Sequence, residues 1–132
     1  MASDYFTHTQ PNPKDGKKSK KIDCVVRAIC IADGLSWIEA FDTLVSIARQ
    51  DYDMPNSIPV CEKALKAKGY DIQSLKPQKG QKRMTAKEFA LTHPDGTYIL
   101  RLAHHLSAVV DGKIRDTWDC GDCCIYKVYT KN

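Results

Sequence analysis

The stretch HHLSAVVDGKIRDTW, residues 104–118, decides how this chain folds. Apolar residues alternate with polar ones on both sides of Asp111-Gly112, a dipeptide typical of a two-residue turn between antiparallel strands. The register that follows pairs Val110 with Lys113, Ala108 with Arg115, Ser107 with Asp116, and His105 with Trp118. Opposed residues of a hairpin point to the same side, so His105, Ser107, Asp116 and Trp118 are predicted to share one face.

This register selects one histidine of the pair His104-His105. His105 becomes the diagonal neighbour of Asp116, whereas His104 is predicted to lie on the reverse face, with the apolar core. A three-residue loop would instead shift the register by one and bring His104 to face Asp116. The choice between the two histidines therefore depends on the turn.

Strands are also predicted on either side of this hairpin, at 98–102 and 125–129, and all four are expected to be antiparallel and sequential. Helical spacing of apolar residues precedes them. One apolar helix is predicted to begin after Asp23, which would cap it, and to end at Gly34. Three more are predicted, after the capping box at Ser36, over 58–68, and after the capping box at Thr85. Because the predicted helices precede the predicted strands along the chain, the sequence predicts an α+β fold. The first helix is expected to be central.

Composition limits the classes to which this chain can belong. Its 132 residues, 42% of them hydrophobic, fit one domain that can bury a core. No secretory signal and no membrane-spanning apolar run is visible, so we expect a cytoplasmic protein without membrane association. Six cysteines, three of them crowded in 120–124, are expected to be reduced thiols rather than a disulfide framework.

Residues 1–21 are predicted to form a flexible basic arm, and the domain is expected to span 22–132. Five lysines between 14 and 21 account for much of the formal net charge of +4. A basic tail can bind nucleic acid through phosphates, but no aromatic residues interleave these lysines and no recognition motif is present. A solvated tail, or a segment across a cleft, is therefore preferred to a nucleic-acid partner.

Cys24 stands at the predicted N-terminus of the central helix, where the helix dipole and free N–H groups favour a thiolate. With His105 as base and Asp116 to orient it, Cys24 would form a nucleophilic triad, and Trp118 would shield the His105–Asp116 pair from water. In the alternative reading, Cys24 is a small buried hydrophobe and Asp116 a solvated carboxylate. The hairpin favours the catalytic interpretation, which requires no cofactor and no metal.

The chain resembles papain-like cysteine peptidases in three segments that follow one another in the same order: DCVVRA (23–28), HLSAVV (105–110) and RDTW (115–118). The likeness is to the compact type found in small bacterial and phage proteins and in double-glycine leader peptidase domains, and it spans about residues 22–119. It implies a papain-like fold and a thiol hydrolase acting on a protein or peptide substrate, in the host cytoplasm if the protein is phage-encoded. A peptidase, deamidase or isopeptidase would each fit this chemistry.

The sequence departs from this family before the cysteine. Members often place a glutamine about six residues upstream to bind the oxyanion, whereas this chain has Gly16-Lys17-Lys18-Ser19 there. The backbone N–H of Cys24 would supply one oxyanion donor, and Ser19 or Lys18 a second. A catalytically inactive papain-like domain that binds or inhibits a partner is the alternative function.

The cluster Cys120-Gly121-Asp122-Cys123-Cys124 admits several readings. CxxC is a common half-site for zinc, but the chain lacks a second CxxC, so a turn with free thiols is preferred. If this turn lies near the cleft, Cys120 would be able to form an inhibitory disulfide with Cys24.

Overall fold

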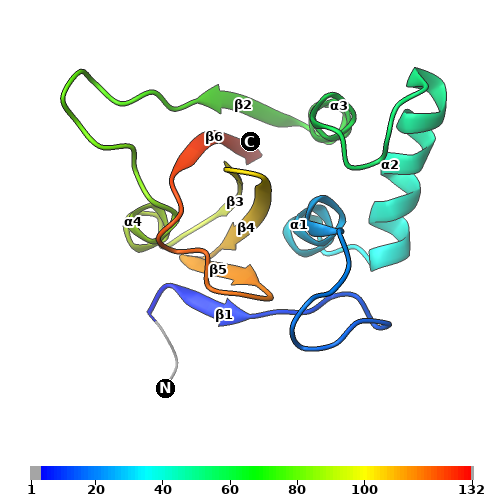
Figure 1. Ribbon diagram of the computed structural model, residues 1–132, viewed down its shortest axis with the longest axis horizontal. Helices are drawn as coiled ribbons and strands as arrows, with labels where there is room; N and C mark the ends of the chain where they lie inside the picture. Colours follow the sequence, from blue (N-terminus) through cyan, green and yellow to red (C-terminus); the bar gives the residue numbers. More distant parts are fainter. Residues whose placement is uncertain (1–3, 132) are drawn as a thin grey trace.

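The computed structural model describes residues 4–131 as a curved mixed sheet with helices on both sides (Figure 1). The helices are α1 (Cys24–Asp33), α2 (Trp37–Asp51), α3 (Ile58–Ala67) and α4 (Ala86–Thr92). The strands are β1 (Phe6–His8), β2 (Tyr70–Ser74), β3 (Thr97–Leu102), β4 (His105–Val110), β5 (Lys113–Asp116) and β6 (Ile125–Lys131). The predicted α+β class is confirmed.

The β4–β5 hairpin has the predicted register. Asp111 and Gly112 have φ values of 50° and 77°, as the two central residues of a type I′ turn require. Val110 pairs with Lys113, and Ala108 pairs with Arg115. A Cβ atom at residue 112 would lie 3.1 Å from the Pro94 backbone, so glycine also permits the turn to pack closely there.

His104 does not lie in the core, contrary to the prediction. It occupies the two-residue turn between β3 and β4, with a φ of 55°, and its side chain is exposed. The physical reason is that β4 begins one residue later, at His105, so the face alternation of the strand does not extend to His104.

The predicted sequential order of the strands is wrong for β6, because the sheet order is β1-β5-β4-β3-β6-β2. Between β5 and β6 the chain turns over the start of α4, where the N–H of Ala86 donates to the Cys123 carbonyl and the N–H of Lys87 to the Gly121 carbonyl. This path carries β6 to the open edge of β3. The other edge of β5 is occupied by β1.

β1 lies within the stretch where the sequence predicts no regular element. The ordered fold was expected to begin near Ile22, yet Phe6–His8 pair in parallel with β5. The sheet is therefore mixed rather than wholly antiparallel. A three-residue strand is too short to show an alternating pattern, which is why the sequence does not indicate it.

Helix α1 lies on the concave side of the sheet and α4 on its convex side (Figure 1). The concave side packs α1, α2 and α3 against residues such as Leu106 and Tyr129, and the convex side packs α4 against residues such as Val109. Capping boxes at Ser36 and Thr85 begin α2 and α4 as predicted. Among residues 4–131, no helix is both long enough and apolar enough to span a bilayer.

Candidate functional site

Cys24 is the first residue of α1 and is partly exposed. The first N–H groups of a helix have no partner within it, and they carry the positive end of the helix dipole. Asp23 was expected to cap these groups with its side chain, but it makes no such hydrogen bond. The start of α1 therefore presents backbone donors beside the Cys24 thiol.

The carboxylate of Asp23 is instead engaged by side chains that converge from three segments. Arg27 forms an ion pair with it one turn along α1. Trp37 Nε1 donates to Asp23 Oδ2 at 2.9 Å, and Asn12 Nδ2 donates at 3.1 Å. Asp23 is buried, so these partners compensate its charge. This network fixes the backbone immediately before Cys24.

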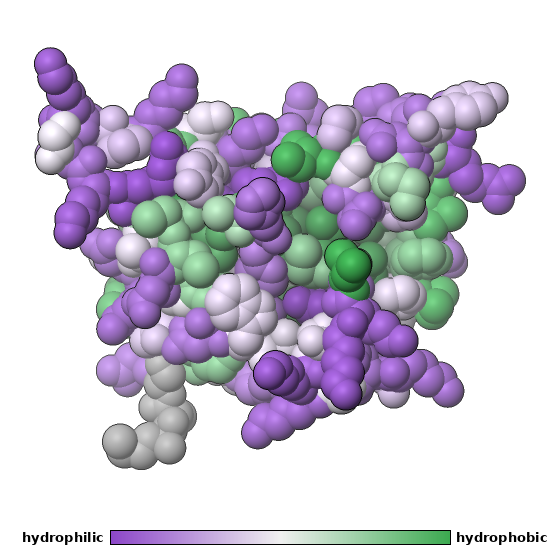
Figure 2. Space-filling view, viewed as in Figure 1, coloured by the Kyte–Doolittle hydropathy of each residue, from purple (hydrophilic) through white to green (hydrophobic). Residues whose placement is uncertain are grey.

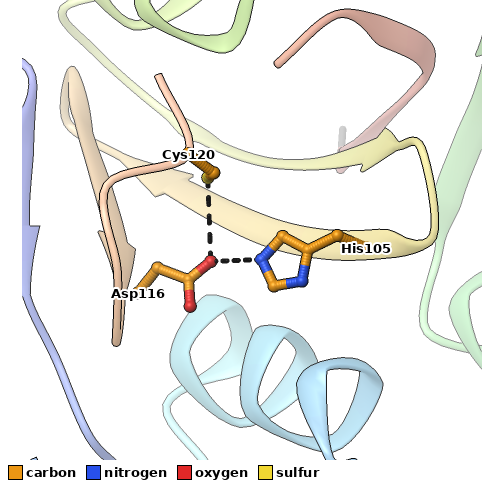
Figure 3. A group of neighbouring side chains, drawn as sticks. All are labelled: His105, Asp116 and Cys120. Carbon is orange, nitrogen blue, oxygen red and sulfur yellow. Dashed lines mark hydrogen bonds and ion pairs between the residues drawn. The ribbon is translucent and has the colours of Figure 1, made fainter. Parts of the chain in front are cut away.

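His105 and Asp116 meet across the hairpin, as the register predicts. His105 is the first residue of β4 and Asp116 the last of β5, and His105 Nε2 lies 2.6 Å from Asp116 Oδ2. Figure 3 shows this contact beside α1. Because Nε2 is occupied by the carboxylate, Nδ1 is the ring nitrogen left for the Cys24 thiol.

The Asp116 carboxylate is held by several further donors. Ser107 Oγ donates to Oδ2 at 2.6 Å, the N–H of Thr117 donates to Oδ1 at 2.7 Å, and Arg27 approaches Oδ1 at 3.4 Å. Burial alone would raise the pKa of Asp116, but its hydrogen bond with the His105 ring and the bonds from Ser107 and Thr117 lower it below the ordinary value. Asp116 is therefore an anion held in a fixed position beside Nε2 of the His105 ring.

The pKa values of Cys24 and His105 shift in opposite directions. Burial raises the pKa of the Cys24 thiol, but a hydrogen bond with His105 and the charges of His105 and Arg27 outweigh it, and the net shift is downward. Burial lowers the pKa of His105, but hydrogen bonds with Asp116, Cys120 and Cys24 raise it to about 11. The pair therefore favours a thiolate beside an imidazolium.

A hollow of about 390 Å³, here called the Cys24 hollow, opens beside these groups. Its lining residues come from the segment before α1, from α1 itself, and from β4 and the end of β5: Lys18, Ser19, Lys21, Ile22, Asp23, Cys24, Arg27, His105, Thr117 and Trp118. The lysine-rich segment thus forms one wall of the hollow. This position agrees with the alternative in which part of the basic arm lies across a cleft.

The two supporting residues predicted from the sequence both line the Cys24 hollow. The Trp118 ring lies against His105, with 4.9 Å between ring centroids, and remains 45% exposed. Ser19 Oγ donates to Asp15 Oδ2 at 3.0 Å and accepts from Arg27 at 3.0 Å. The Ser19 hydroxyl proton is therefore used within the protein, which leaves Lys18 as the freer of the two expected oxyanion donors.

Sequence reasoning did not assign a role to Arg27, which bridges Asp23 and Asp116. Its spacing of four residues from Asp23 on one helix is a signal for an ion pair. Ser107 was placed on the correct face without a role, although its position opposite Asp116 indicates a hydrogen bond. These two residues orient the carboxylate on which His105 depends.

Cys120 contacts the same carboxylate from another side (Figure 3). Its Sγ lies 3.8 Å from Asp116 Oδ2 and is buried. The ligand atoms of His105, Asp116 and Cys120 lie within 4.8 Å of one another, so within residues 4–131 these three form a group that could hold a metal ion. A hydrogen bond between Cys120 and the His105 ring also contributes to the elevated pKa of His105.

All six cysteines lie within the described residues and are free thiols, as expected. Cys24 and Cys120 are therefore not joined in this structure, and the inhibitory disulfide between them stays a hypothesis. Burial raises the pKa of Cys61 to about 11 and also raises the pKa of Cys30 and Cys123. Cys24 differs from these three thiols in the direction of its shift.

No family model matches this chain, and it has no significant match among curated proteins or among solved structures.

Proposed function

We propose that this protein is a thiol hydrolase of the papain-like type, with Cys24 as nucleophile, His105 as general acid and base, and Asp116 as the group that orients His105. The observation that carries this proposal is that Cys24 and His105 line the same hollow, where the His105 ring binds Asp116 at 2.6 Å and lowers the pKa of the Cys24 thiol. Cys24 also stands at a helix N-terminus, where backbone N–H groups face the hollow. The combination supplies both an activated nucleophile and room for a substrate.

The proposed reaction has two steps. The Cys24 thiolate attacks the carbonyl carbon of an amide, and the resulting tetrahedral intermediate expels the amine as His105 donates its proton to the leaving nitrogen. A thioester then joins the acyl group to Cys24. In the second step neutral His105 takes a proton from water, the hydroxide adds to the thioester, and the acid leaves with restoration of the thiolate–imidazolium pair.

The oxyanion of each intermediate needs donors beside Cys24. The backbone N–H of Cys24 lies in the first turn of α1, where helical N–H groups are free. The Lys18 ammonium is the second donor in this proposal, because Lys18 lines the Cys24 hollow and Ser19 donates to Asp15. One such donor is typically worth on the order of a hundredfold or more in rate.

The experiment that tests the proposal compares Cys24 with Cys61 in one protein sample. Iodoacetamide labelling at a series of pH values, read by peptide mass spectrometry, should modify Cys24 well below pH 8. Cys61, whose pKa is raised to about 11, should react only after unfolding. p-Nitrophenyl acetate should then acetylate Cys24 in the native protein and should do so far more slowly in His105→Ala.

Equal, slow labelling of Cys24 and Cys61 would contradict the proposal. Rapid alkylation of Cys24 without any acetyl transfer would also count against hydrolysis. That second result would favour the alternative, a binding or inhibitory domain that keeps the shape of the site without its chemistry.

A further inference from the structure

An apolar groove of about 850 Å³ lies beside the Cys24 hollow. This volume is in the range of sites that enclose a ligand. The apolar side chains around it come from the segment before α1, from α1, from α2 and from the loops that flank α2, and they include Ile22, Val26, Trp37, Ile38, Phe41 and Met54. The Trp37 and Phe41 rings stack at 5.0 Å, so one wall of the groove is a rigid aromatic surface.

Several of the groove's apolar side chains are exposed to an unusual degree. The exposed fraction is 89% for Ile22, 59% for Ile38 and 65% for Met54. Figure 2 shows hydrophobic residues at the surface over α1 and α2, bordered by hydrophilic ones. A contiguous exposed apolar surface of this kind marks an interaction site in a folded protein.

The groove adjoins the Cys24 hollow. Lys21, Ile22 and Asp23 line both cavities, and Asp23 directly precedes Cys24 in the chain. A polypeptide whose carbonyl reaches Cys24 therefore has apolar surface available for its neighbouring side chains. This shared lining distinguishes the groove from an isolated hydrophobic patch.

The charge around both cavities is positive. Lys14 and Lys21 line the groove, and Lys18 and Lys21 line the Cys24 hollow. Asp23, the carboxylate common to both linings, is buried and paired with Arg27, so it does not offset these lysines. Such a rim attracts acidic groups and repels basic ones.

We infer that the groove binds a peptide segment that carries aromatic or branched aliphatic side chains beside acidic residues, and that such segments are the substrate class of the Cys24 site. The apolar side chains enter the groove, and the acidic ones meet Lys14, Lys18 and Lys21. That these peptides are substrates rests on the proposed function, whereas their binding to the groove does not.

The test uses four fluorescein-labelled decapeptides of equal length, with either a Leu-Phe or a Ser-Gln centre and with either acidic or lysine flanks. Binding to the full-length Cys24→Ala variant is followed by fluorescence anisotropy, so no turnover interferes. The peptide with the Leu-Phe centre and acidic flanks should bind at least about tenfold more tightly than each of the other three.

Matched variants locate the binding surface. Ile38→Asp and Met54→Asp should each weaken that peptide by about tenfold or more, because both place a charge in the groove. Leu91→Asp is the control, since Leu91 is 51% exposed on α4 and does not line the groove. Lys21→Glu should lower the affinity for acidic flanks and raise it for lysine flanks, whereas Lys79→Glu, in a distant exposed loop, should do neither.

Equal affinity for the four peptides, or equal losses in Ile38→Asp and Leu91→Asp, would overturn the inference. So would self-association of the protein in sedimentation experiments that Ile38→Asp abolishes, because the groove would then be covered by a second copy. Selective binding without cleavage by the wild-type protein would leave the groove assignment standing and reject the proposed hydrolysis.

Discussion

The Asp116 carboxylate binds the His105 ring through Nε2, at 2.6 Å. Because Nε2 is bound to the carboxylate, Nδ1 is left for the Cys24 thiol. The contact also keeps a buried negative charge at the edge of the ring. The pKa of His105 is consequently raised, and that of Cys24 is lowered, by the same short chain of hydrogen bonds. Four predictions follow from this relationship and from the network around it.

The two adjacent histidines should differ sharply in their effect on the reactivity of Cys24. His105→Ala removes the proposed base, and the rate of acetyl transfer to Cys24 should fall by about 10² to 10⁴-fold. His104→Ala should leave that rate unchanged, because His104 is exposed in the β3–β4 turn. Stopped-flow detection of p-nitrophenolate measures both, and a comparable loss in His104→Ala would contradict the register described here.

Asp116→Asn should shift the pH dependence of Cys24 alkylation upward. Removal of the negative charge lowers the pKa of His105 by about 1–3 units and withdraws part of the stabilisation of the thiolate. The midpoint of iodoacetamide labelling then moves toward the ordinary cysteine value. Circular dichroism verifies that the variant is folded, and an unchanged labelling midpoint would show that Asp116 does not govern the pair.

The pH dependence of stability should reveal the elevated pKa of His105 once Cys24 is removed. In Cys24→Ala, folded His105 still binds a proton that the unfolded chain releases near its ordinary value of about 6.5. Its contribution is therefore complete below pH 6.5 and declines as the pH rises toward the folded pKa, which is about 11 in the wild type. The free energy of unfolding should fall from pH 6.5 to 9, by at most about 1.4 kcal/mol per pH unit.

Cys24 is replaced in that experiment because its pKa shift has the opposite sign. A lowered pKa contributes stability above the unfolded value and loses it as the pH falls, so it would mask the slope from His105. Urea titrations at each pH give the free energies. The double variant Cys24→Ala with His105→Gln should show no such decline over this range, and persistence of the slope would assign it to another group.

Asp23→Asn should destabilise the fold much more than Asp51→Asn. Asp23 is buried and paired with Arg27, and its loss leaves a buried guanidinium with reduced compensation, at a cost of about 3–5 kcal/mol. Asp51 pairs with Lys63 at the surface, where such pairs contribute less than about 1 kcal/mol. Urea denaturation of both variants measures the difference, and equal costs would exclude a structural role for the Asp23 network.

The parts of the site that the sequence predicts are those that follow from strict local rules. The turn at Asp111-Gly112 fixes the register, and the register brings Asp116 within reach of His105. Capping boxes fix the starts of α2 and α4. These signals are short-range, and each has a single low-energy geometry.

The features that the sequence does not predict depend on contacts between distant segments. β1 has only three residues and gains its partner β5 from the far end of the chain. β6 was expected beside its predecessor but pairs with β3 because the residues after β5 are held against α4. Asp23 has the residue type of a helix cap, yet Arg27, Trp37 and Asn12 compete successfully for its oxygens.

The pairing of β1 with β5 also bears on how the chain matures during synthesis. The ribosome releases the segment from β1 to Cys24 before it releases β4 and β5, which carry the imidazole and the carboxylate. Until then the sulfur lacks the neighbours that lower its pKa, and the wall containing Lys18 and Lys21 lacks the strand that anchors one of its ends. The Cys24 thiol of a growing polypeptide therefore acquires its lowered pKa only after β4 and β5 have been released and have joined the sheet.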